Sequence, residues 1–119
     1  MSDVYKNRSI VLANNAQTAV YTVPTANAST QPPQKPVQAV IKSIRLSNVS
    51  GSGVTATVVN ADSSVGSDIN IVDVLAIAAN TATEVLTQPL VLKDSDVIKV
   101  TASAGGALHV IISVLEISE

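Results

Sequence analysis

The chain contains no phenylalanine, tryptophan or cysteine, so any core that it forms must be built almost entirely from small aliphatic side chains. Large aromatic residues normally contribute about 150–250 Å² of buried surface each. Without them, either many aliphatic residues must pack together or apolar surface must be buried against neighbouring molecules. The chain is 46% hydrophobic and only 13% charged, with a mean hydropathy of +0.37. Because no apolar run approaches the roughly 18 residues that span a bilayer, this excess predicts a protein oligomer.

The length and charge of the chain limit the number of domains and the kinds of partner that we expect. With 119 residues, the chain predicts one domain over residues 1–119. The net charge is −2 and the basic residues are scattered, which argues against a nucleic-acid partner. The absence of cysteine excludes disulfides and thiolate metal sites. The first residues lack the apolar segment of a signal peptide, so we expect synthesis in a cytoplasm without export and no membrane partner.

Most of the sequence shows the alternation or the short β-branched runs that are typical of strands. The predicted fold is therefore all-β, a single antiparallel β-sandwich or jelly-roll-like domain of about eight strands with an extended N-terminal arm. The expected strands cover residues 9–13, 18–23, 38–48, 54–60, 69–78, 81–88, 97–103 and 107–117. A helix over residues 73–80 is the main alternative. Its short length and the preceding Ile-Asn-Ile-Val sequence favour a strand.

The segments between these strands contain residues that favour turns. Glycine and serine at residues 50–53, and Ala-Gly-Gly at residues 104–106, predict tight hairpin connections, and Asn80 predicts another. Residues 24–37 are predicted to form a long loop, because the prolines among them cannot donate to a ladder. The polar residues 1–8 are predicted to form an extended arm that lies on a partner.

Two predicted strands are apolar on both faces, although a strand packed on one side needs only one apolar face. In the last strand, one face is predicted to carry Leu108, Val110, Ile112 and Val114, and the other Ile111, Leu115 and Ile117. Residues 69–78 behave similarly, with Leu75 and Val72 predicted on opposite faces. Such strands imply either a closed barrel wrapped by other segments or an outer face buried in a neighbouring subunit.

Residues that could carry chemistry are few. His109 is the single histidine, without a nearby partner for acid-base catalysis, and it is predicted to be structural. The pairs Asp62 with Asp68 and Asp94 with Asp96 do not have the spacing of a calcium-binding EF-hand, and they are expected in turns. Two tyrosines are too few for a sugar-binding platform. We therefore predict no catalytic residue, no metal site and no cofactor.

Several segments together resemble small β-sandwich virion proteins of tailed bacteriophages. These are Tyr-Thr-Val-Pro at residues 21–24, Ile-Lys-Ser-Ile-Arg-Leu-Ser-Asn at residues 41–48, the Pro-Leu-Val-Leu and Asp-Val-Ile-Lys-Val elements within residues 89–100, and the hydrophobic strand at residues 110–117. The resemblance covers roughly residues 18–118 and carries no catalytic motif. The proline-rich expansion between residues 24 and 38 departs from the simplest version of the pattern.

The resemblance implies a non-enzymatic virion protein made in the cytoplasm of a bacterial host, most specifically a capsid decoration or cement protein. It would act as a homo-oligomer, with a trimer favoured, and would bridge phage coat subunits. The residues expected to contact the coat are Tyr5, Pro32, Pro33 and Pro36, and those expected in subunit packing are Ile111, Leu115 and Ile117. A neck or tail accessory protein and a host-glycan or receptor-binding module remain as alternatives.

Overall fold

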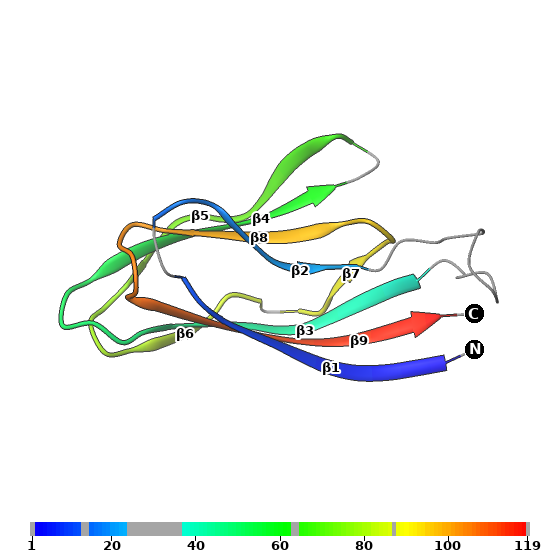
Figure 1. Ribbon diagram of the computed structural model, residues 1–119, viewed down its shortest axis with the longest axis horizontal. Coiled ribbons are helices and arrows are strands. Elements are labelled where there is room, and N and C mark those ends of the chain that lie inside the picture. The colour runs from blue at the N-terminus through cyan, green and yellow to red at the C-terminus, as the bar shows by residue number, and fades with distance from the viewer. Residues whose placement is uncertain (1, 13–14, 24–36, 63–64, 87, 119) are drawn as a thin grey trace.

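The structure is a computed structural model that describes residues 2–12, 15–23, 37–62, 65–86 and 88–118. Within these ranges, nine strands form two antiparallel sheets that pack face to face (Figure 1). The strands are β1 (Ser2–Val11), β2 (Thr18–Thr22), β3 (Val37–Asn48), β4 (Val54–Asp62), β5 (Ser67–Ile77), β6 (Ala82–Glu84), β7 (Leu90–Leu92), β8 (Val97–Ala102) and β9 (Leu108–Ser118). The prediction of an all-β sandwich is confirmed, and residues 73–77 belong to a strand instead of the alternative helix. No helix in the described ranges is long and apolar enough to cross a membrane.

The strand order is not that of a simple meander. Sheet A has the order β1-β9-β3, and β6 and β7 follow one another along the free edge of β3. Sheet B has the order β2-β8-β4-β5. The β3–β4 and β8–β9 turns therefore connect different sheets, so the hairpins predicted at residues 50–53 and 104–106 are wrong. Positive φ angles at Asn80 (57°) and Gly106 (73°) turn the chain between the two layers.

The core lies between the sheets and is aliphatic, as the composition requires. Val110, Ile112 and Val114 project inward from β9, and Ile98 and Val100 project from β8, each fully or almost fully buried. Tyr21 is the one aromatic residue among the buried residues of the described chain. Burial of each such aliphatic side chain stabilises the fold by about 1.5–3 kcal/mol.

The N-terminal segment belongs to the sheet. β1 pairs with β9 from Ser2 opposite Ser118 to Val11 opposite His109, so residues 2–8 form an edge strand of the sheet and not a separate arm. Contact of this segment with a partner stays a prediction. The sequence gives no strand signal here because the core-facing positions of β1 hold Lys6 and Arg8. A long basic side chain can lay its aliphatic stem over the edge of a core and keep its charged end exposed.

Strand β5 is irregular where it crosses the middle of β4. Ala56 pairs with Leu75 and Val58 pairs with Val72, so two residues of β5 stand opposite one residue of β4. This is the geometry of a β-bulge. Within it, Val74 has a positive φ of 50°, and its N–H donates to the Thr57 hydroxyl at 3.1 Å.

The bulge corrects the prediction that this strand has two apolar faces. Val72 and Leu75 both pair with buried residues of β4, and directly paired residues share a face of the sheet. Both therefore face the core, although a regular strand would place them on opposite sides. The apolar residues left exposed on β5 are Ile69 and Val74.

The strand predicted over residues 81–88 is much shorter than expected. It ends at Glu84. Beyond this point β3 has a register shift between Ile41 and Ser43, which interrupts the regular hydrogen bonding of its edge. The Glu84 carboxylate accepts hydrogen bonds from the Ile44 N–H at 2.8 Å and the Leu86 N–H at 3.3 Å, and also one from the Ser43 hydroxyl. A side chain thus replaces the missing ladder bonds, and β7 resumes the edge at Leu90.

Asn48 holds the turn that connects the two sheets after β3. Its buried side-chain amide donates to the carbonyl oxygens of Ser52 (2.8 Å), Ile77 (3.1 Å) and Ala78 (3.3 Å). Its side-chain oxygen accepts from the Ser50 N–H and hydroxyl. One side chain therefore joins the end of β3, the turn and the end of β5.

We expect Asn48→Ala to lower the free energy of unfolding by about 2–3 kcal/mol, because it leaves buried backbone groups without partners. Urea-induced unfolding followed by circular dichroism measures the change. Asn70→Ala, at an exposed position of β5, is the matched control and should stay within about 0.5 kcal/mol of the unmodified protein. Equal effects of the two substitutions would show that Asn48 has no special role.

Candidate functional site

The outer face of sheet A carries a row of apolar side chains across four strands. Tyr5 of β1 pairs with Leu115 of β9, Leu115 pairs with Val40 of β3, and Val40 pairs with Val91 of β7. Directly opposed residues lie on one face of a sheet, so these four side chains are neighbours. Tyr5 is 74% exposed and Val91 is 67% exposed, while the two central residues are half-buried. We call this set the apolar row.

Further apolar side chains lie on the same face. Ile111 is 42% exposed, and Val11 is exposed beside His109. These three residues line a shallow hollow of about 240 Å³ near the β8–β9 end of sheet A. Ile117 is half-buried and follows Leu115 on the same side of β9.

The outer face of sheet B has a different character. Thr57 of β4 pairs with Thr101 of β8, and Val59 pairs with Lys99. Lys99 also forms an ion pair with Asp68 of β5 at 3.8 Å. The two outer faces therefore differ, since one presents hydroxyls and an ion pair and the other presents the apolar row.

The four described residues of the predicted interface fall on a single face. Tyr5, Ile111, Leu115 and Ile117 all project from the outer side of sheet A, although they were expected in two separate contacts. Pro32, Pro33 and Pro36, with the predicted loop that contains them, lie outside the described residues.

Sequence reasoning missed Val40 and Val91. Each is the one apolar residue on the outer side of its strand, and only the register of β3 against β9 and β7 shows that the two continue the row. A cross-strand pair depends on residues that are distant in the sequence, so no local pattern reveals it.

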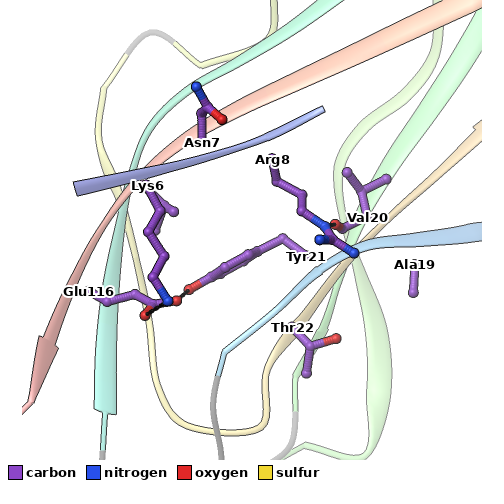
Figure 2. Close-up of a pocket in the computed structure, with 9 residues that line it drawn as sticks. Lys6, Asn7, Arg8, Ala19, Val20, Tyr21, Thr22 and Glu116 are labelled. Carbon is purple, nitrogen blue, oxygen red and sulfur yellow. Dashed lines mark hydrogen bonds and ion pairs between the residues drawn. The ribbon is translucent and has the colours of Figure 1, made fainter. Parts of the chain in front are cut away.

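A polar cleft of about 340 Å³ lies where β1 and β2 meet at the open side of the sandwich (Figure 2). Glu116 of β9 is buried there and accepts a hydrogen bond from the Tyr21 hydroxyl at 2.6 Å. Its other oxygen forms an ion pair with Lys6 at 2.9 Å. Beside them, Arg8 Nε donates to the Val20 carbonyl oxygen at 3.2 Å.

Lys6, Tyr21 and Glu116 together connect the two sheets, and we call these three residues the clamp. Tyr21 belongs to sheet B, whereas Lys6 and Glu116 belong to sheet A, so the carboxylate connects the two layers. Burial, together with the hydrogen bond to Glu116 and its negative charge, raises the pKa of the Tyr21 hydroxyl well above its ordinary value of 10.0. The hydroxyl therefore stays protonated as a donor, and the arrangement stabilises the structure without activating a nucleophile.

Two of the aspartates considered as ion ligands, Asp62 and Asp96, share an ion pair with Lys93. Lys93 Nζ lies 2.5 Å from Asp62 Oδ1 and 3.3 Å from Asp96 Oδ2. The Asp96 carboxylate also accepts from the Lys93 N–H at 3.2 Å. The hydrogen bond to Asp62 is the main reason that the pKa of the Lys93 ammonium lies above its ordinary value. Within the described residues, no group of three or more His, Cys, Asp or Glu side chains is placed to hold a metal ion.

The sequence matches no protein-family model and no curated protein. The fold is similar to that of a chain from Bacillus endospore appendages, described as disulfide-linked pili, with a TM-score of 0.56 and 13% identity over 98% of this chain and 88% of that one. It is also similar to a chain from the acidic stable capsid structure of Helicobacter pylori bacteriophage KHP30, with a TM-score of 0.55 and 9% identity over 100% and 95% of the two chains. At these identities the likeness shows a shared fold.

The clamp predicts how stability depends on alkaline pH. The pKa of Tyr21 is higher in the folded state than in the unfolded chain, so its stabilising contribution is complete below pH 10 and is lost as the pH rises above it. Tyr21→Phe should therefore reduce the loss of unfolding free energy above pH 10 by up to about 1.4 kcal/mol per pH unit. Urea titrations at several pH values measure this slope.

Tyr5→Phe is the matched control, because Tyr5 is exposed on the outer face of sheet A. Its slope above pH 10 should equal that of the unmodified protein. The pKa of Lys93 is raised as well, but Lys93 is present in all three proteins, so its effect cancels and the comparison isolates Tyr21. An unchanged slope in Tyr21→Phe would contradict the clamp.

Proposed function

We propose that this protein is a non-enzymatic structural subunit of a phage virion, most specifically a decoration or cement protein that bridges coat subunits on the capsid surface. It would act as a homo-oligomer, with a trimer as the favoured state. The exposed apolar row on a rigid sheet is the observation that carries this proposal. Exposed apolar patches of this kind commonly mark sites of protein association.

The strand order supports a virion setting. Sheet A has four strand positions, β1, β9, β3 and the edge shared by β6 and β7, and sheet B has the order β2-β8-β4-β5. This order supports a jelly-roll arrangement, an architecture that is used by viral capsid domains and also by lectins. The fold shared with a chain of the KHP30 capsid structure over the full length points in the same direction.

Adhesion by such a surface requires no strong single contact. Removal of apolar surface from water contributes roughly 25 cal/mol per Å². Tyr5 and Val91 supply exposed apolar area, and the flanking half-buried residues add to it. A modest contact of this kind becomes effective when it is repeated over many copies on one particle.

A filament subunit is the second candidate, as in a tail or a pilus-like assembly. The similarity to a chain from Bacillus endospore appendages favours it. Those pili are described as disulfide-linked, whereas this chain has no cysteine, so its copies would have to associate non-covalently. A glycan-binding module has less support, because Tyr21 is buried and Tyr5 stands alone as an exposed aromatic among the described residues.

Electron cryomicroscopy of particles from the phage that encodes the chain tests the proposal. We expect hundreds of copies spread over the capsid surface, and a deletion mutant whose capsids burst at a lower temperature than the parent. Particles that lack an unrelated tail gene provide the control for general damage to the particle. About six to a few dozen copies at the neck or tail, or deletion capsids as robust as the parent, would overturn the decoration role.

A further inference from the structure

Strand β1 is attached to the sandwich mainly through backbone and polar contacts. Within the described chain it pairs with β9 alone, along its whole length. Of its described side chains, Lys6, Arg8 and Ile10 stand opposite buried residues of β9 and therefore face the core. Ile10 is the one of these three that packs against the hydrophobic core. Separation of β1 from β9 would therefore expose little apolar surface of β1 itself at these positions.

The position beside β9 fits a strand that carries two basic side chains on one face. The buried Glu116 carboxylate forms an ion pair with Lys6 at 2.9 Å, and the Val20 carbonyl oxygen accepts from Arg8 Nε at 3.2 Å (Figure 2). Alternate residues of a strand share a face, so the two cations must be two positions apart. Lys6 and Arg8 are the one pair of Lys or Arg residues with this spacing in the sequence. The segment that fits is therefore β1, from the same copy or from another copy of the chain.

Leu12 marks the point at which β1 can separate from the sandwich. It is 1% exposed, its N–H donates to the Leu108 carbonyl oxygen at 3.0 Å, and its own carbonyl oxygen accepts from the Gly106 N–H at 2.7 Å. β1 precedes the other strands, so the chain continues from it to them through Leu12. Figure 1 shows β1 extending from this connection along the length of sheet A. The strand can therefore leave β9 while Leu12 stays in the core.

We infer that β1 is exchanged between copies, so that β1 of one subunit pairs with β9 of a second copy of this chain. Lys6 of one copy then forms the ion pair with Glu116 of the other. Tyr5 likewise takes its place beside Leu115 of the other copy, so the apolar row consists of residues from two subunits. This inference rests on the proposed function and deepens it by naming the contact through which copies assemble.

The exchange preserves the contacts of β1. The backbone ladder, the ion pair and the hydrogen bond are the same within one copy and between two copies, and for this reason strand exchange is a low-cost route to association. The balance between the two forms depends on the local concentration of copies, which is high when many subunits lie on one particle. Each subunit gives one strand and receives one. The copies therefore join as a closed pair, a ring or an open chain, according to the orientation of neighbours.

Cysteine cross-linking tests the exchange, because the natural chain has no cysteine. Asn7 of β1 lies opposite Ser113 of β9. Directly opposed residues of antiparallel strands have Cα atoms about 4.5–5.5 Å apart, which is within the range of a disulfide. One chain carries Asn7→Cys, and a second chain, made larger by a tag, carries Ser113→Cys. Exchange brings the two substituted positions of different chains together in the β1–β9 ladder.

A mixture of chains with Ser47→Cys and with His109→Cys is the matched control. Ser47 of β3 lies opposite His109 on the same β9 strand. β3 pairs with strands on both of its edges, so it cannot be exchanged without unfolding of sheet A. The control mixture therefore measures the disulfides that form by random collision. Circular dichroism and thermal unfolding confirm that all four variants are folded.

The chains of each mixture are combined in reduced form, incubated below the unfolding temperature until the yield is constant, oxidised and separated on non-reducing gels. We expect at least about tenfold more linked heterodimer from the first mixture than from the control, because exchange places the two thiols at a high effective concentration. Peptide mass spectrometry should locate the disulfide between positions 7 and 113. A chain with both Asn7→Cys and Ser113→Cys should give covalent oligomers together with internally linked monomers.

Two results would overturn the inference. They are a heterodimer yield equal to that of the control mixture, and a double variant that gives internally linked monomers alone. The assay uses purified full-length protein, so it is independent of the virion setting. A yield at the control level, with the chain present on capsids, would remove strand exchange and leave the proposed function standing. Efficient exchange by a chain that is missing from capsids would remove the virion role alone.

Discussion

The structure depends on the placement of β9 between β1 and β3. Along this strand, alternate residues face opposite sides, so Leu108, Val110, Ile112 and Val114 fill the core while Ile111 and Leu115 form part of the outer surface. Glu116 then occupies a core-facing position at the end of the strand, where the Tyr21 hydroxyl donates a hydrogen bond to it and Lys6 balances its charge. One strand thereby joins the two sheets, supplies the core and carries the centre of the apolar row.

Much of the fold could be predicted from the sequence because alternation survives wherever a strand covers the core on one side. Residues 38–48, 54–60 and 97–103 follow that rule, and their strands lie within a residue or two of the predicted bounds. Alternation does not reveal a strand where polar or charged side chains occupy the core-facing positions. Only the end of β1 was predicted, within the strand expected over residues 9–13, because Lys6 and Arg8 occupy core-facing positions earlier in it. The β5 pattern was misinterpreted because a bulge moves Val72 and Leu75 to one side.

The candidate surface could be predicted in part for a similar reason. Ile111, Leu115 and Ile117 stand out because a second apolar face within one strand is visible in the sequence itself. Val40 and Val91 become meaningful only through cross-strand register, which depends on turns and bulges elsewhere in the chain. Asp96 was expected in a turn, and its carboxylate accepts a hydrogen bond from the Lys93 N–H.

The pairing of the first strand with the last has a consequence for how the molecule folds. Ser2 lies opposite Ser118, so sheet A is completed by a contact between nearly the two most distant residues of the chain. Figure 1 shows the two ends side by side. Such non-local contacts require closure of a large loop before they stabilise anything, which slows folding. During synthesis, β1 and β3 must wait for β9 to emerge, while β4 and β5 can pair early, so sheet A is the later layer to form.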